Sequence, residues 1–381
     1  MIDDRRLQLS SFLTHLGESL DITETQREAA VKHYEAVGNW LNEEDSPIAV
    51  YAPQVYPQGS FRLGTMIKPI NDADEYDIDL VCEMQSLKKE NTTQKQLKDM
   101  VGNRLKANER YRRELEEGNR CWTLQYADSA HFHMDILPAI PDLEIDEIAS
   151  LIGTALAGTA ILITDKELRE WQRSNPVGYA EWFKERMRVQ FTLNRMALAE
   201  SLRASVEAVP EYKVKTPLQR AIQILKRHRD IMFANDQHDR PISIIISTLA
   251  ARAYENEADL LDALQTIVSK MPNLIERDAQ GNAIVRNPVN PLENFADKWR
   301  KHPQRETKFL RWLQQVQVDL DAALRTGDVR DMTEVLKPRF GDRAVNEASK
   351  EAFPTRFSAG STAAAAAPTI TISNPSKPWR P

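Results

Sequence analysis

The pattern of apolar and polar residues predicts two helices at the start of the chain. Leu13 and Leu16 belong to one run of apolar residues at helical spacing, and Val37 and Leu41 belong to a second. Both runs repeat every three or four residues, which is typical of a helix with one buried face. The repeat is interrupted near 21–23, so the first helix is expected to end there and the second to begin.

From about residue 49 to residue 141 the pattern changes to short runs rich in Val, Ile, Tyr and Leu. These runs are VYAPQVYPQGS, DIDLVCEM and HFHMDILPAI, and the turn residues between them favour β-strands. A charged segment with helical periodicity, LKDMVGNRLKANERYRRELEEG, lies between the second and third runs. Strands that alternate with helices predict an α/β or α+β lobe built on a sheet.

After about residue 142 the strand signals fade, and long segments with helical periodicity follow. We therefore expect N-terminal helices and the sheet in residues 1–165, and a helical lobe in residues 166–350. From Phe357 onward the chain has no acidic residue, a run of five alanines and four prolines. Such a segment cannot bury an apolar face, so residues 351–381 are expected to form a flexible tail.

Composition argues against several classes of protein. The chain has 381 residues, and 50 Lys and Arg against 56 Asp and Glu give a net charge of −6, which argues against a surface that binds nucleic-acid phosphates throughout. Cys82 and Cys121 are too few for a disulfide framework or a structural zinc site. The N-terminus lacks a secretory pattern and no apolar run approaches about 18 residues, so we expect a soluble, cytoplasmic protein.

Three aspartates are candidate metal ligands. Asp77 and Asp79 are two residues apart in DIDLV, so on a strand both carboxylates project from one face. Asp135, in HMDIL, lies on a separate strand. Carboxylates held close together repel each other unless a divalent cation lies between them, and Mg²⁺ prefers such oxygen ligands. Three carboxylates on neighbouring strands can hold two Mg²⁺ ions for transfer of a nucleotide with loss of pyrophosphate, although a lone Asp-x-Asp is more often an acidic turn.

Two further segments are candidate phosphate-binding elements. Gly59 and Ser60, in PQGSF, follow a strand-like run, where glycine lets a phosphate approach the backbone and the hydroxyl adds a donor. Downstream, Lys226 lies beside an apolar helical stripe and Ser243 lies near the start of a buried helix, positions from which both can contact a triphosphate. Taken singly, each has a commoner explanation. Gly59 and Ser60 can form a turn, Lys226 can lie on a solvated helix face, and Ser243 can belong to the first turn of a helix.

A rival interpretation treats HFHMD as the ligand set of a metallohydrolase. His131, His133 and Asp135 alternate along one strand and are expected to share a face. Such a site needs further histidine ligands, and the histidines downstream lie in helical or linker segments. The carboxylate interpretation is therefore favoured.

As a whole, the pattern resembles the polymerase-β-type nucleotidyltransferases, and within them the bacterial cGAS/DncV-like nucleotidyltransferases. QGSF, HMDILPAIP, LREWQRSNPVGYAEWF, LKRHRD, PISIIIS and FGDRAVN are similar to segments of that family in the same order, and are close in pattern to its cholera-type members. The resemblance covers roughly residues 50–345. It implies an α+β fold of two lobes, in which a mixed-sheet palm with N-terminal helices is followed by a helical C-terminal lobe.

The resemblance also implies roles for the candidate residues. The three aspartates would be catalytic and would bind two Mg²⁺ ions, for which Mn²⁺ can substitute, and Asp135 would help to deprotonate the attacking ribose hydroxyl. Gly59 and Ser60 would contact the donor phosphates. Lys226 and Ser243 would contact the triphosphate from the helical lobe.

The implied activity is synthesis of a cyclic di- or trinucleotide second messenger from ATP, GTP or other ribonucleoside triphosphates, in antiphage signalling through a separate effector protein. No nucleic acid and no membrane are required. The bases and the linkage are not readable from the sequence. The same aspartates would serve an enzyme that modifies a protein or an RNA end, and this alternative stays open, as does a non-catalytic protein with the same fold. Some relatives carry a C-terminal tail that is conjugated to a partner and ends in a small residue, whereas this chain ends in Trp379-Arg380-Pro381.

Overall fold

The structure is a computed structural model that describes residues 2–71, 75–126, 132–145, 158–168 and 170–354. These residues form two compact units, a sheet unit (22–183 and 287–293) and a helical unit (2–21, 184–286 and 294–354). Most of the tail expected at 351–381 lies outside the described residues.

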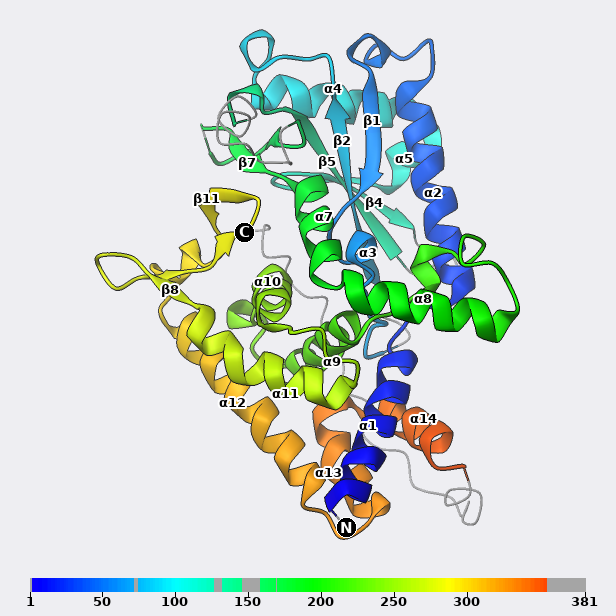
Figure 1. Ribbon diagram of the computed structural model, residues 1–381. Coiled ribbons are helices and arrows are strands. Elements are labelled where there is room, and N and C mark those ends of the chain that lie inside the picture. The colour runs from blue at the N-terminus through cyan, green and yellow to red at the C-terminus, as the bar shows by residue number, and fades with distance from the viewer. Residues whose placement is uncertain (1, 72–74, 127–131, 146–157, 169, 355–381) are drawn as a thin grey trace. The chain divides into compact units, whose positions relative to one another are not determined.

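The sheet unit is built on a seven-stranded mixed sheet (Figure 1). Its elements in chain order are α2 (Glu24–Asn42), β1 (Pro53–Pro57), α3 (Gly59–Leu63), β2 (Tyr76–Met84), α4 (Gln94–Ala107), α5 (Glu109–Glu114), β3 (Leu115–Glu117), β4 (Trp122–Tyr126), β5 (Phe132–Pro141), β6 (Ile161–Ile163) and β7 (Gln172–Ser174). The strand order is β1-β2-β5-β4-β3, with β6 beside β5 and β7 beside β6. β2 and β5 are parallel, and the other pairs described in this sheet are antiparallel.

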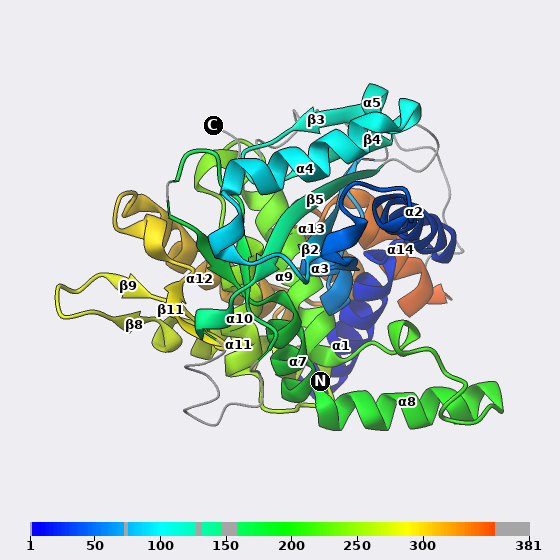
Figure 2. The same ribbon diagram turned by 90° about the horizontal axis from the view of Figure 1, so that it is seen from above.

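Helices α2 and α4 cover one face of this sheet, and Figure 2 shows α4 running along β5. Val37 of α2 and Val101 of α4 are fully buried in a core shared with Ile78 of β2 and Met134 of β5. Because side chains alternate along a strand, the residues between these core positions project from the opposite face of the sheet. That opposite face carries the candidate aspartates.

Three helices begin at the sequence pattern Thr-x-x-Gln. In each, the threonine side chain accepts a hydrogen bond from the backbone N–H of the glutamine, and the glutamine side chain accepts one from the threonine N–H. This capping box satisfies donors that a helix otherwise leaves without partners. The three starts are Thr23 of α2, Thr93 of α4 and Thr216 of α9 (Pro217–Met232).

In the helical unit, other helices are arranged around α9. The other elements of this unit are α1 (Ile2–Ser19), α8 (Arg188–Leu202), α10 (Ser243–Ala253), α11 (Leu260–Lys270), β8 (Glu276–Arg277), β9 (Ala283–Ile284), α12 (Gln304–Leu324), α13 (Val329–Phe340) and α14 (Asp342–Ala352). Helix α7 (Pro176–Arg186) and the two-stranded pair β10 (Arg286–Asn287) and β11 (Asn290–Asn294) cross the boundary between the units. Within the described ranges, every helix is too short or too polar to span a bilayer.

Helix α1 belongs to the helical unit, whereas the sequence pattern grouped both N-terminal helices with the sheet. Leu9, Leu13 and Leu16 of α1 are fully buried, and α1 packs against α9, α11, α12 and α14. At its end, Arg220 of α9 donates to the carbonyl oxygen of Gly17 at 2.6 Å. An amphipathic pattern predicts that a helix has a buried face, but it does not identify the partner of that face.

A buried polar network holds α9 against α12. Trp312 Nε1 donates to His228 Nδ1 at 3.1 Å, and His228 Nε2 lies 2.9 Å from Asp319 Oδ2. Arg339 Nε pairs with the other oxygen of Asp319 at 3.1 Å. Burial acts to raise the pKa of Asp319, but the hydrogen bond from His228 and the other partners outweigh it, so the pKa lies below its ordinary value.

Candidate active site

The sequence alternation in DIDLV places two aspartates on the face of the sheet away from α2 and α4. Ile78 and Leu80 of β2 are fully buried in the core, while Asp77 and Asp79 between them are partly exposed. Successive side chains of a strand point to opposite faces of the sheet, so when the apolar residues face the core, the carboxylates between them face the other way. The predicted common face of the two carboxylates is therefore present.

The strand register brings the third aspartate beside them. In the parallel pair of β2 and β5, Asp79 lies opposite Asp135, and Asp77 lies opposite His133. Neighbouring strands are about 4.8 Å apart, so residues that are paired across them are direct neighbours on the sheet face. Asp135 is 3% exposed, which makes it the most enclosed of the three carboxylates.

The carboxylate of Asp77 is paired with a histidine. His133 Nε2 contacts Asp77 Oδ1, and His133 Nδ1 lies 3.1 Å from Glu75 Oε2. His133 is 5% exposed, so this buried ring is held between two carboxylates. The other histidine of the rival ligand set, His131, lies outside the described residues.

Gly59 lies directly against Asp79. The backbone N–H of Gln58 donates to the carbonyl oxygen of Asp79 at 2.8 Å, and the chain then turns at Gly59 with φ of 59°. A Cβ atom at position 59 would lie 2.6 Å from Asp79 Oδ2, so glycine is required both by the backbone conformation and by the close approach of the carboxylate. Ser60 follows in α3 and is partly exposed.

Asp135 accepts a hydrogen bond from the next strand of the sheet. Thr123 of β4 is fully buried, and its hydroxyl donates to Asp135 Oδ1 at 2.5 Å. The antiparallel register of β4 and β5 places these two residues opposite each other. The hydroxyl of Thr123 therefore limits the orientation of the Asp135 carboxylate.

The carboxylate oxygens on this face of the sheet are ligands of the kind that a magnesium ion prefers. Asp79 and Asp135 offer these oxygens from adjacent strands, and the absence of a side chain at Gly59 lets the loop pass close to Asp79 Oδ2. Among the described residues, no group of three or more His, Cys, Asp or Glu side chains is arranged to hold a metal by itself. Protein magnesium sites commonly use one or two carboxylates, with waters and substrate phosphates as the remaining ligands.

Lys226 and Ser243 lie in the helical unit. Lys226 of α9 is 4% exposed, so the solvated position that its sequence context favoured is wrong. It is buried because five other helices of the unit pack around α9. Ser243, the first residue of α10, accepts a hydrogen bond from Arg229 Nη1 at 2.9 Å, and the same nitrogen donates to the carbonyl oxygen of Pro241 at 3.1 Å.

Sequence reasoning missed Thr123 and Arg229. A signal for the first was present, since Trp122 and Leu124 alternate with polar residues and thereby indicate a half-buried strand. No local signal identifies Asp135 as the partner of Thr123, because cross-strand register depends on the whole sheet. Arg229 was visible as part of LKRHRD, but its bond to Ser243 depends on the packing of α9 against α10.

Comparisons with known proteins identify the family of the chain. Residues 7–186 match the Second Messenger Oligonucleotide or Dinucleotide Synthetase domain. A c-di-GMP synthase of Roseivirga ehrenbergii is 31% identical over 339 residues, which are 88% of this chain and 85% of that relative. The structure of Bradyrhizobium diazoefficiens CdnG in complex with GTP is 26% identical, with a TM-score of 0.70 over 90% of this chain and 98% of that chain.

The similarity to a structure of lower sequence identity concerns the fold alone. Vibrio cholerae DncV, a cyclic AMP-GMP synthase in complex with a linear intermediate, is 16% identical, with a TM-score of 0.52 over 91% of this chain and 87% of that chain. The predicted fold class, a two-lobed α+β nucleotidyltransferase, is confirmed. On the similarity to these relatives, the protein belongs to the bacterial cGAS/DncV-like nucleotidyltransferases, enzymes that synthesise cyclic oligonucleotide second messengers.

Proposed function

We propose that this enzyme joins two ribonucleoside triphosphates into a cyclic dinucleotide, with GTP as one substrate and pyrophosphate as the leaving group. The sequence leaves the bases and the ring size open. Support for guanine and for a dinucleotide comes from the relatives, one of which is a c-di-GMP synthase and another of which has a solved structure with GTP. ATP stays the alternative second substrate, since the Vibrio cholerae relative is a cyclic AMP-GMP synthase.

The observation that carries the proposal is the pairing of Asp79 with Asp135 across β2 and β5, with Gly59 pressed against Asp79. We propose these carboxylates, together with Asp77, as ligands of two Mg²⁺ ions, which Mn²⁺ can replace. Bound at carboxylates, such ions make a hydroxyl more acidic and neutralise the charge of a triphosphate.

The protein's own residues would then bind and orient the reactants. A ribose hydroxyl attacks the α-phosphorus, the new P–O bond forms as the bond to pyrophosphate breaks, and the hydroxyl proton leaves. Asp135 is the proposed group that helps to take this proton, because it is the most enclosed carboxylate on the face. A second transfer within the linear product closes the ring.

The phosphate contacts are proposals that rest on family resemblance and on local chemistry. Gly59 and Ser60 follow β1 at the edge of the carboxylate face and are proposed to contact the donor phosphates. Lys226 supplies a positive charge and Ser243 a hydroxyl, and both are proposed to bind triphosphate oxygens. The bond from Arg229 occupies the Ser243 oxygen as an acceptor, which leaves the hydroxyl proton to be donated elsewhere.

The proposed biological role is antiphage signalling, in which the cyclic product binds and activates a separate effector protein. The proposed place of action is the cytoplasm, which supplies the ribonucleoside triphosphates. A regulatory or conjugating partner that acts through the C-terminal tail belongs to the same proposal, and its residues lie outside the described ranges.

The test is to incubate the pure full-length enzyme with the four ribonucleoside triphosphates and Mg²⁺ or Mn²⁺, treat the mixture with phosphatase, and identify the surviving products by mass spectrometry. A phosphatase-resistant cyclic dinucleotide that disappears when GTP is omitted is expected. Linear nucleotide, or nucleotide attached to protein, would instead support the alternative in which the enzyme modifies a protein or an RNA end.

Variants separate metal chemistry from folding. Asp79→Asn should abolish metal-dependent turnover and leave the melting temperature close to that of the parent. Glu83→Gln is the matched control, because Glu83 lies on the same face of β2 but its carboxylate accepts a hydrogen bond from Tyr56 at 2.8 Å. Full turnover by Asp79→Asn would overturn the assignment of the carboxylate face.

A further inference from the structure

The polar face of the sheet continues onto a strand that the proposed mechanism does not use. In β4, Trp122 and Leu124 are buried in the core on the helix-covered face, so Thr123 between them projects from the face that carries the aspartates. Thr123 is fully buried, and it lies opposite Asp135 in the antiparallel register.

The contact between these two side chains is short and specific. The Thr123 hydroxyl donates to Asp135 Oδ1 at 2.5 Å, within the range of charge-assisted O–H···O⁻ bonds. A carboxylate that is 3% exposed, as Asp135 is, needs such a donor in place of water. The branched side chain of threonine restricts the positions that its hydroxyl oxygen can take, and the hydroxyl itself supplies the hydrogen bond that orients the carboxylate.

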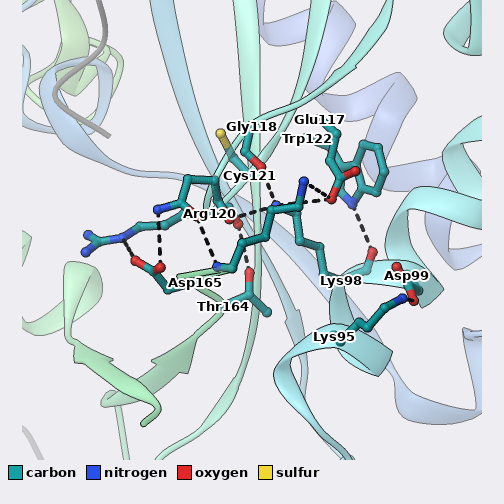
Figure 3. A network of polar contacts seen from close by, with 12 residues as sticks. Lys95, Lys98, Asp99, Glu117, Gly118, Arg120, Cys121, Trp122, Thr164 and Asp165 are labelled. Carbon is teal, nitrogen blue, oxygen red and sulfur yellow. Dashed lines mark hydrogen bonds and ion pairs between the residues drawn. The ribbon is translucent and has the colours of Figure 1, made fainter. Parts of the chain in front are cut away.

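The strand that carries Thr123 is itself anchored at its start, as Figure 3 shows. Trp122 Nε1 donates to the carbonyl oxygen of Lys98 at 2.9 Å. Lys98 is 3% exposed, and its ammonium donates to the carbonyl oxygens of Gly118 and Asn119 in the turn before β4. Helix α4 therefore holds both the turn and the first residue of β4, and the position of Thr123 follows from this anchor.

We propose that Thr123 is a positioning residue that holds the Asp135 carboxylate in the orientation needed to bind a divalent cation. The inference rests on the proposed function of Asp135 as a metal ligand. Partners that orient a ligand through a hydrogen bond typically contribute 10-fold to 100-fold to metal affinity or activity. Thr123 does not touch the reacting atoms and acts through Asp135 alone.

The experiment compares Thr123→Val, which keeps the branched shape and removes the hydroxyl, with Thr123→Ser, which keeps the hydroxyl. The primary measurement is Mn²⁺ binding to the full-length enzyme in the presence of a non-hydrolysable GTP analogue, followed by electron paramagnetic resonance of the free ion. Turnover as a function of Mg²⁺ concentration, kcat and the KM for GTP are measured beside it. Thr123→Ala replaces the valine variant if that protein does not fold.

A matched control is available on the same unit. Thr164 is 1% exposed and its hydroxyl donates to the carbonyl oxygen of Arg120 at 2.7 Å, so Thr164→Val loses a similar buried hydrogen bond away from the aspartates (Figure 3). Mn²⁺ affinity is expected to fall about 10-fold to 100-fold in Thr123→Val, with a matching loss in kcat and little change in the KM for GTP. Thr123→Ser and Thr164→Val should bind Mn²⁺ like the parent.

The outcomes distinguish this inference from the function on which it rests. If Asp135→Asn loses Mn²⁺ affinity but Thr123→Val keeps it, the positioning role of Thr123 is wrong and the metal assignment stands. If Asp135→Asn binds Mn²⁺ like the parent, the proposed ligand role of Asp135 fails first. Equal losses in Thr123→Val and Thr164→Val would show a general effect of removing a buried hydroxyl and would also overturn the proposal.

Discussion

Replacing Gly59 by alanine is the sharpest single test of the carboxylate face. The new methyl group would lie 2.6 Å from Asp79 Oδ2, whereas ordinary contact begins at 3.4 Å. The carboxylate, or the loop that bears the alanine, must therefore move by 0.8 Å. The backbone of Gly59 adds a second cost, because its φ of 59° lies in the left-handed region.

The two costs act on different properties. A left-handed conformation costs an L-residue about 1–2 kcal/mol, so the melting temperature should fall by about 2–4 °C per kcal/mol for a unit of this size. A displacement of about 1 Å at reacting groups can lower the rate on the order of 100-fold. Gly59→Ala should therefore remain folded at 25 °C and lose most of its turnover.

Gly281→Ala supplies the control for the backbone cost. Gly281 has φ of 83° in the turn between β8 and β9, and no atom lies within 4 Å of the position that its Cβ would take. It should show a similar fall in melting temperature, measured by differential scanning fluorimetry, and unchanged formation of product. If Gly59→Ala retained the turnover of the parent, the close approach of the loop to Asp79 would not matter for catalysis and the reasoning would be wrong.

Three other measurements test separate parts of the structure. Arg229→Lys should raise the KM for GTP about 10-fold with little change in kcat, because a lysine ammonium does not reproduce the guanidinium geometry that bonds both Ser243 and the Pro241 carbonyl oxygen; an unchanged KM in steady-state kinetics would count against the proposed role of Ser243. Burial, with a smaller effect of a neighbouring carboxylate, raises the pKa of Cys82 to about 12, so iodoacetamide at pH 8 should label this thiol only after unfolding, and labelling of the native enzyme in peptide maps would contradict its burial. Burial acts to raise the pKa of Asp319, but its hydrogen bonds, first that from His228, lower the pKa below its ordinary value. The ionised carboxylate therefore contributes fully to the stability of the fold above the ordinary pKa of about 3.9, and this contribution is lost as pH falls through the lowered pKa. Denaturant unfolding between pH 6 and pH 3 should show a shallower loss of stability in the Asp319→Asn variant, and an unchanged slope would contradict the assignment.

Local patterns were sufficient for the elements and for the shared face of two carboxylates. The interruption near 21–23 separates α1 from α2, and Thr23 begins α2 with a capping box. The alternation around Asp77 and Asp79 predicts their common face, because strand geometry alone decides it. Each of these predictions uses residues that lie within a few positions of one another.

The partners of buried groups were not predictable in this way. The solvated position favoured for Lys226 is wrong because α9 is surrounded by other helices, and the number of helices that pack on a given helix is not encoded in its own periodicity. The placement of α1 in the helical unit has the same origin. A hydrophobic stripe along a helix indicates that one face is buried, but the stripe is the same whichever element covers that face.

The carboxylate face combines both kinds of information. The sequence places Asp79 and Asp135 on strands, but only the parallel register makes them neighbours, and a shift of one residue would turn Asp135 into the core and bring a core residue to the face. The same register places Thr123 beside Asp135 through the antiparallel pairing of β4 with β5. Any change that preserves the composition of these strands but shifts their register should therefore remove metal-dependent turnover while secondary structure persists. Catalysis then depends on the pairing of the strands as much as on the identity of the aspartates.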